Sequence, residues 1–432
     1  MSAPSSVDLS ARAPLSPVTS TERIVALDVL RGLALLGVVV ANVWLWFSGL
    51  FLRFPGYRDE LRGVSLDAVV FFAIAILVSG KAISTFSFLF GHGFAIQMMR
   101  ADARGRSIVG TYSRRLFVLL LIGLLHVSLL WYGDVLVPYA ILGFVLILFR
   151  KRSDRALLRW VVVLMVGLPL LMGAAPLIAR AFGVEAPSLD MEAMAARHAA
   201  TLSVFQSGDY SAIVRENLVQ AGKLFYFGRK ALFLMYILGL FLLGLYVGRR
   251  RMFEQVEGYR PLFRRIAIWG IPIGIAAGIV VAWMQMTFEP AEMFSRPALA
   301  LAAVTVSTVS MLPLAAGYVS AVTLLLQSPR WSRRLSVFAP VGRMALTNYL
   351  SQTVVMVLLF NGYGAGLIGR TGPALGLVIA VLVFAAQTMV SAVWLRHYRF
   401  GPMEWLWRSL TYGRMQPMRR QVASEGPLVA LP

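Results

Sequence analysis

The sequence has no cysteine, only four histidines, and charged residues at just 14% of its 432 positions. Without cysteine there can be no disulfide, no thiolate nucleophile and no cysteine-ligated metal. The histidines stand at positions 92, 126, 198 and 397, which is not the spacing of metal ligands. The sequence also contains no phosphate-binding loop, dinucleotide-binding fingerprint or zinc motif, so no tightly bound cofactor is expected.

The scarcity of charge is matched by an excess of apolar residues. Soluble domains carry about 25% charged residues, whereas 58% of this chain is hydrophobic. Apolar runs such as 24–47 are long enough to cross a bilayer as helices. The composition therefore predicts an all-α, polytopic transmembrane helical bundle.

Ten apolar segments, each ending near arginine, glycine or proline, predict about ten crossings. They lie at 24–47, 66–99, 115–132, 134–149, 157–182, 229–248, 264–288, 298–326, 339–360 and 373–395. The second segment is too long for one crossing and has Lys81 near its middle. We expect it to form a helix along the membrane surface, followed by a crossing that passes Gly91-His92-Gly93.

The distribution of charge predicts how the bundle is oriented. Lysine and arginine outnumber aspartate and glutamate by 41 to 20, which gives a formal net charge of +21. The arginines gather in alternate loops, near 100–115, 150–159, 249–265 and 330–343. Because cytoplasmic loops carry the excess of lysine and arginine, these loops and both termini are predicted to be cytoplasmic. Arginines that flank membrane segments do not indicate nucleic-acid binding, and none is expected.

The domain organisation follows from these segments. Residues 1–23 are rich in serine, alanine and proline and predict a disordered tail before an uncleaved first helix. Residues 24–414 are expected to form the transmembrane helical domain, and 415–432 a second disordered tail. Within the domain, the segment 183–228 has too few apolar residues for a core of its own. It is predicted to be an extracytoplasmic helical insert that caps the bundle.

Three polar residues in the first helix are candidate substrate-binding groups. Asn42 lies eleven positions after Arg31, almost three helical turns, so the two share one face about 16 Å apart. Asp28 lies within one turn of Arg31. One interpretation is an ion pair that anchors the helix, with Asn42 bonding a neighbouring helix. The other makes Arg31 the ligand of an anionic group that enters from the cytoplasm, since a guanidinium suits phosphate.

A second candidate site lies between the third and fourth segments. His126 stands inside an apolar helix, where a polar side chain is costly and is a functional candidate. Asp134 follows eight residues later, so the pair can meet only if the turn at Tyr132-Gly133 folds the chain back. His126 would then be a general base oriented by Asp134. Alternatively, His126 bonds a carbonyl group and Asp134 is the N-cap of the next helix.

Three further residues complete the candidate substrate-binding set. His92 lies between two glycines, where a role in helix packing is favoured over chemistry. The ninth segment begins near Arg343 and places Asn348 and Gln352 one turn apart on one face. Hydrogen bonds between helices explain this pair as well as a substrate groove does.

Several motifs in order along the chain resemble a known family. They are the stretches 27–37, 86–93, 342–352 and 399–414, together with His126 and the run 132–140. These stretches resemble the bacterial YeiB-like proteins of the DUF418 family, and the likeness covers nearly everything except the tails and 183–228. More distantly, the chain is similar to the acyltransferase-3 and heparan-glucosaminide acetyltransferase membrane proteins.

That wider resemblance implies a function. Such proteins move an acyl group from a cytoplasmic acyl-coenzyme A to an acceptor across or within the membrane. The resemblance implies acyl-CoA as donor substrate, an envelope glycan or lipid as acceptor, and a place in the bacterial inner membrane. In acyltransferase-3 proteins the first helix carries arginine and, eleven residues later, histidine. Here Arg31 matches but Asn42 replaces the histidine and cannot act as a base, so His126 with Asp134 is our hypothesis for the catalytic pair.

Two other functions stay open at this point. A transporter or flippase for a small solute or lipid-linked intermediate could use the same polar faces, and a discontinuous helix at mid-membrane would favour it. A deep single cavity would favour acyl transfer. A non-catalytic membrane partner of another enzyme is the third possibility, which the asparagine at position 42 supports.

Overall fold

The computed structural model describes residues 24–53, 57–61, 63, 65–183, 190–226, 229–288, 292 and 296–420. Throughout these residues the regular structure is helical, apart from one isolated β-bridge between Tyr398 and Arg419. The prediction of an all-α fold is confirmed. The predicted tail 1–23 lies outside the described residues.

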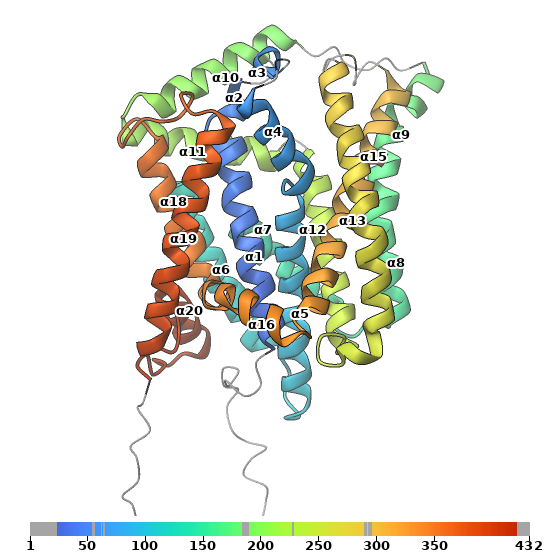
Figure 1. Cartoon of the computed structure of the whole chain (residues 1–432), viewed down its shortest axis with the longest axis vertical. Coiled ribbons are helices and arrows are strands. Elements are labelled where there is room, and N and C mark those ends of the chain that lie inside the picture. The colour runs from blue at the N-terminus through green and yellow to red at the C-terminus, as the bar shows by residue number, and fades with distance from the viewer. Residues whose placement is uncertain are drawn as a thin grey trace, which may run out of the picture.

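The helices follow one another through the described residues (Figure 1). The longer ones are α1 Val25–Asn42, α4 Leu66–Leu77, α5 Lys81–Asp102, α6 Val109–Leu129, α7 Leu136–Leu148, α8 Asp154–Val162, α9 Leu168–Ala181, α10 Met191–Gln206, α11 Tyr210–Tyr226, α12 Arg229–Arg249, α13 Val256–Thr287, α15 Pro297–Leu325, α18 Ala345–Phe360, α19 Pro373–His397 and α20 Pro402–Tyr412. The shorter ones are α2 Leu50–Arg53, α3 Tyr57–Glu60, α16 Pro329–Leu335 and α17 Ala339–Arg343, with π-helical turns at Val43–Phe47 and Val163–Gly167 and a 3-10 turn at Ser336–Phe338.

The membrane-spanning helices match the apolar segments of the sequence. Among the described residues, 8 helical stretches are long and apolar enough to cross a membrane. The two remaining predicted segments correspond to α7, with 13 residues, and α18, with 16. At 1.5 Å per residue they are about 20 and 24 Å long, shorter than the hydrocarbon core of about 30 Å. These two short helices both belong to the site described below.

The two ends of the bundle differ in what they carry. In Figure 1, α16 and α20 lie at the lower end, where α1 also begins, and α10 and α11 lie across the upper end. The turn between α7 and α8 joins the turn after α12, because Arg249 donates to the carbonyl groups of Arg150 and Arg152. Figure 1 shows the turn after α12 at the same end as α16 and α20, so these arginine-rich turns gather there, at what we call the basic end. The opposite end, covered by α10 and α11, we call the insert end.

The described part of the predicted insert forms the two helices α10 and α11, which pack directly on the bundle. The Tyr210 hydroxyl donates to the carbonyl oxygen of Leu129 over 2.9 Å, and the Asn217 amide donates to that of Leu130 over 3.3 Å. On the other side, the N–H of Gly362 donates to the carbonyl oxygen of Phe205 over 2.8 Å. The insert is thus fixed to the end of α6 and to the turn after α18, where it covers the region around His126.

The segment 66–99 differs from expectation. We predicted a helix along the membrane surface, but α4 packs against α13 and α19 and continues in the direction of α5 (Figure 1). The two helices are separated by a break at Gly80, whose φ of 79° favours glycine. Lys81 is only 3% exposed and donates from Nζ to the carbonyl oxygen of Ala75 over 3.3 Å. The break therefore leaves a discontinuous helix whose freed carbonyl group is bonded internally.

The predicted tail 415–432 begins too early. The N–H of Arg399 donates to the carbonyl oxygen of Met418, and the Trp405 indole donates to that of Gln416 over 2.7 Å. Residues 415–420 therefore fold back onto α20 and the end of α19. Composition missed this because residues 415–420 take part in these bonds through backbone carbonyl groups, which every residue type carries. Residues 421–432 lie outside the described residues.

Candidate functional site

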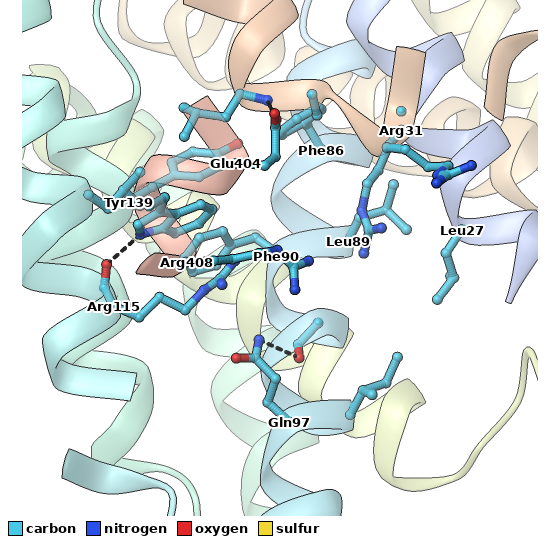
Figure 2. Close-up of a pocket in the computed structure, with 18 of the residues that line it drawn as sticks. Leu27, Arg31, Phe86, Leu89, Phe90, Gln97, Arg115, Tyr139, Glu404 and Arg408 are labelled. Atoms are coloured by element: carbon cyan, nitrogen blue, oxygen red, sulfur yellow. Dashed lines mark hydrogen bonds between the residues drawn. The ribbon is translucent and has the colours of Figure 1, made fainter. Parts of the chain in front are cut away.

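A cavity of about 300 Å³ lies between α1, α5, α6, α7, α18 and α20 (Figure 2). On α1 its lining runs from Ile24 at the basic end to Val38. That stretch is about four helical turns, so the cavity reaches about 21 Å into the bundle. The cavity therefore has a mouth at the basic end and an inner end deep among the helices.

Arginines dominate the mouth. The arginines that line the cavity are Arg31, Arg100, Arg104, Arg115, Arg343 and Arg408, and all are half-buried. Figure 2 shows Arg31 and Arg115 on opposite sides of it. Only two acidic residues, Asp28 and Glu404, are among the described residues that line the cavity. An excess of fixed positive charge within low-dielectric walls attracts anions, and guanidinium groups bind phosphate in particular.

Arg31 takes part in an ion pair and in the cavity wall at once. Its Nη1 lies 3.0 Å from Oδ1 of Asp28, and its side chain is 29% exposed. A guanidinium has five N–H donors, so Arg31 can bind an anion while it stays paired with Asp28. The two interpretations of this residue from the sequence are therefore compatible.

Glycine lets α17 approach α1 closely at this point. A side chain at Gly342 would collide with the carbonyl oxygen of Asp28. The close approach places Arg343 in the cavity wall beside the Asp28–Arg31 pair.

Helix α20 closes one side of the mouth. The Arg115 guanidinium carbon lies 3.6 Å from the centre of the Trp407 ring, and the Trp407 indole donates to the Arg115 carbonyl oxygen over 2.8 Å. Cation–π contact and hydrogen bond together fix α20 to α6. No residue of α20 was among the candidate site residues of the sequence, so its role in the cavity wall was missed.

Glu404 of α20 supplies the N-terminal cap of α18. Its carboxylate accepts hydrogen bonds from the N–H groups of Leu346 over 2.6 Å and Thr347 over 3.1 Å, and from the Thr347 hydroxyl over 2.6 Å. The residue at the N-cap position, Met344, has no side chain that could do this. Burial raises the pKa of the Glu404 carboxyl above its usual value, and the bonds from Thr347 and Leu346 oppose that rise.

The inner end of the cavity is apolar and aromatic. It is formed by Leu119 of α6, by Val135 with Leu136 and Tyr139 at the start of α7, and by Tyr349 of α18. The Tyr139 hydroxyl is bonded to Ser87 over 2.6 Å, so its polar group is satisfied within the wall. This end suits an uncharged, narrow part of a ligand.

His126 and Asp134 meet directly beyond this inner end. Nδ1 of His126 lies 2.9 Å from Oδ1 of Asp134, and the two side chains are almost completely buried. As the pairing requires, the turn at Tyr132-Gly133 folds the chain back. Gly133 is needed there, because a side chain at this position would collide with the ring of Trp131. The contact has hydrogen-bond length but does not have the angle of a straight hydrogen bond.

Asp134 also caps α7, because its Oδ2 accepts the N–H of Val137 over 2.7 Å. The two alternatives for Asp134, contact with His126 and capping of the helix, are thus present in one arrangement. Its backbone bond holds the carboxylate in place beside the imidazole.

Thr353 is the third member of this cluster and was missed in the sequence. Its hydroxyl lies 3.0 Å from Nε2 of His126, and the side chain is 3% exposed. The ring of Tyr349, one turn earlier on α18, lies 5.3 Å from the His126 ring between ring centres. The two bonded residues are 227 positions apart, so nothing in the local sequence could pair them.

The remaining predicted residues do not line the cavity. His92 is fully buried against Phe88 and Phe253, and its ring nitrogens have no hydrogen-bond partner within the described part of the chain. Asn42 is half-buried near the other end of α1. Asn348 donates to Ser391 of α19 over 3.0 Å and so connects two helices. Of the predicted substrate-binding set, the cavity brings together Asp28, Arg31 and Arg343.

The described residues contain no group of three or more histidine, aspartate or glutamate side chains that could hold a metal ion.

Comparison with known proteins identifies the family. Residues 247–414 match a family model described as "Protein of unknown function (DUF418)". The protein YxaH of Bacillus subtilis strain 168 is 33% identical over 425 residues, which cover 94% of this chain and 98% of that protein. The chain belongs to the DUF418 family. The family resemblance noted in the sequence is confirmed.

Two other relatives extend over nearly the whole chain. YeiB of Escherichia coli strain K12 is 28% identical over 402 residues, covering 90% of this chain and 96% of YeiB. A 39.9 kDa protein from the amylase 3' region of Bacillus acidopullulyticus is 29% identical over 409 residues, covering 94% and 98%. All three relatives are described as uncharacterized. Its apolar helices make this chain a multi-pass membrane protein, and its relatives are bacterial.

Proposed function

We propose that this protein transfers an acyl group from a coenzyme A thioester, taken up at the basic end, to an acceptor hydroxyl or amine. The observation that carries the proposal is the polarity of the cavity along its length. Its mouth is lined by arginines, and its inner end is apolar and stops beside the His126–Asp134 pair.

The donor suits this shape. A coenzyme A thioester carries several phosphate charges at one end and a narrow, uncharged acyl arm at the other. The phosphates would lie among Arg31, Arg104 and Arg343, while the arm points inward along α1. With the charged end held at the mouth, the thioester is directed to Tyr349 at the inner end.

His126 would supply the base. Asp134 orients Nδ1, so Nε2 takes the proton of the group that attacks the thioester carbon. The carbon–sulfur bond breaks, and the imidazolium returns the proton to the departing thiolate. A positioned base of this kind contributes about 10²- to 10⁴-fold to the rate.

The charge of the loops supports an orientation in the bacterial inner membrane with the basic end in the cytoplasm. Acyl-CoA is then available at the mouth, and an envelope glycan or lipid would be the acceptor, approaching from the side of the insert end.

The test is thermal stability of the purified protein during titration with acetyl-CoA. A ligand that binds only the folded state raises its melting temperature, by an energy of about 2.7 kcal/mol at 100 times Kd. We expect saturable stabilisation of the wild type and its loss in Arg31→Ala. The matched control is Arg260→Ala, because Arg260 is exposed on α13 and outside the cavity lining. Equal stabilisation of the Arg31→Ala and control variants, or none in the folded wild type, contradicts the donor site.

Transport is the second candidate, and one specific observation favours it. The α4–α5 helix is discontinuous, and the buried Lys81 lies at the break, as in transporters whose broken helices hold the substrate near mid-membrane. Reconstituted vesicles loaded with acetyl-CoA and an acceptor distinguish the two. If intact solute crosses the membrane at a rate that depends on Lys81 but not on His126, the function is transport and not acyl transfer.

A further inference from the structure

Thr353, His126 and Asp134 form one continuous chain of contacts. The Thr353 hydroxyl lies 3.0 Å from Nε2 of His126, whose Nδ1 lies 2.9 Å from Asp134. The same hydroxyl lies 3.3 Å from the carbonyl oxygen of Tyr349, so the contact to the imidazole is the shorter one. A hydroxyl next to an imidazole that a carboxylate orients is the arrangement that activates a nucleophile.

Thr353, His126 and Asp134 form a triad. Thr353 and His126 continue the two helical faces that line the cavity. On α18 the lining includes Ala345 and Tyr349, and Thr353 follows one turn later on the same face. On α6 the lining ends at Leu119, and His126 follows two turns later on that face. Thr353 is therefore about 6 Å further along α18 than the last residue in the cavity wall.

One side chain stands between the cavity and the triad. Tyr349 lines the cavity and packs against the His126 ring at 5.3 Å between ring centres. Access from the inner end of the cavity to the Thr353 hydroxyl therefore requires rotation of the Tyr349 ring.

We propose that Thr353 is a catalytic nucleophile that holds the acyl group as an ester during transfer, an inference that rests on the proposed function. Oγ1 of Thr353 attacks the thioester carbon while Nε2 of His126 takes the hydroxyl proton. The carbon–sulfur bond breaks, and the proton passes from Nε2 to the coenzyme A thiolate. In the second step His126 takes a proton from the acceptor hydroxyl, whose oxygen displaces Thr353 Oγ1, and the proton returns to Thr353.

This route explains how a donor from one end can serve an acceptor from the other. The acyl group stays bonded to Thr353 of α18 while coenzyme A leaves through the basic end. The acceptor then approaches from the insert end, under α10 and α11, and the two substrates never occupy the cavity together.

The test is a rapid-quench reaction of the full-length wild type with acetyl-CoA and no acceptor. We expect a stoichiometric burst of coenzyme A thiol and, in peptide mass spectra, one acetyl group on Thr353. Thr353→Val should abolish the burst, with at least a 100-fold loss expected for removal of a nucleophile. Thr353→Ser should keep the burst and carry the acetyl group at position 353.

Thr323→Val is the matched control. Thr323 is fully buried in α15 and bonds the carbonyl oxygen one turn before it, as Thr353 does, but it does not line the cavity. This variant should keep the burst, and melting curves of all variants with and without acetyl-CoA report folding and donor binding.

The outcomes separate the two proposals. If the wild type turns over acetyl-CoA but Thr353→Val keeps that turnover and no acetyl group is found at position 353, the nucleophile is wrong and acyl transfer stands. If the folded wild type neither binds nor cleaves acetyl-CoA, the proposed function fails and the nucleophile fails with it.

Discussion

The mouth and the inner end of the cavity differ in how their polar side chains are buried and paired. At the mouth, arginines from five helices and the connection after α5 are half-buried and outnumber the acidic residues. At the inner end, His126, Asp134 and Thr353 are almost completely buried and contact one another. A half-exposed charge can be removed at little cost, because water replaces the lost partner. A buried contact chain cannot lose a member without leaving another polar group unpaired.

Because of this difference, substitutions at the two ends should affect different properties of the protein. Changes at the mouth should alter donor affinity and leave the chemical step intact. Changes at the inner end should alter the chemical step and leave donor affinity intact.

The largest effect is expected at the inner end. Asp134→Asn keeps the shape of the side chain but removes the charge that orients Nδ1 of His126. We expect turnover to fall by about 10²- to 10⁴-fold, the contribution of a positioned base, while stabilisation by acetyl-CoA is unchanged. Steady-state release of thiol measures the first and melting curves the second. Loss of acetyl-CoA binding with intact turnover would reverse the assignment of the two ends.

His126→Ala tests the base at the inner end directly. This change leaves the Asp134 carboxylate buried without its neighbour, and an unsatisfied buried polar group costs about 1–3 kcal/mol. We expect loss of turnover together with a clear fall in melting temperature, and the double variant His126→Ala with Asp134→Asn should recover part of the stability. Full activity in the single variant would exclude His126 as the base.

A smaller effect is expected at the mouth. Arg104→Gln removes one positive charge from the lining. We expect affinity for acetyl-CoA to fall by about tenfold, the equivalent of 1.4 kcal/mol, with kcat unchanged. Because salt screens partly exposed charges, the affinity of the wild type should also fall as ionic strength rises. An affinity that is insensitive to both the variant and to salt would show that the mouth does not bind the anion.

Glu404 lies between these extremes, because it is buried yet belongs to the mouth. Glu404→Ala removes the cap of α18 and should cost about 1–2 kcal/mol of unfolding free energy. Burial raises the pKa of the Glu404 carboxyl in the folded state. Its protonation therefore favours the folded state, so the wild type should gain stability relative to Glu404→Gln as pH falls through the raised pKa towards the ordinary value. Stability curves of the two proteins against pH that run parallel would contradict this assignment.

Much of the fold could be predicted from the sequence, because apolar length and arginine-rich turns are local signals. The ten segments correspond to eight long and two short apolar helices, and the turn before Asp134 brings it to His126. The local signals misplaced the helix over 66–77. Its high apolar content fits a surface helix or a buried one, and only packing against α13 and α19 decides between them.

The candidate site could be predicted only in part, for a physical reason. The Asp28–Arg31 and His126–Asp134 pairs join residues within one turn or across one short loop. The contacts of Thr353 with His126, and of Glu404 with α18, join helices that are distant in sequence. Such contacts depend on how the whole bundle packs, which no spacing in one helix reveals.

The most direct test of the account is an experimental structure of the protein with a non-hydrolysable acetyl-CoA analogue. We predict density along the cavity, with the phosphates among Arg31, Arg104 and Arg343 and the acetyl end at Tyr349, one turn from Thr353. A cavity that stays empty, or an analogue bound with its phosphates away from these arginines, would contradict the assignment of the basic end as the donor entrance.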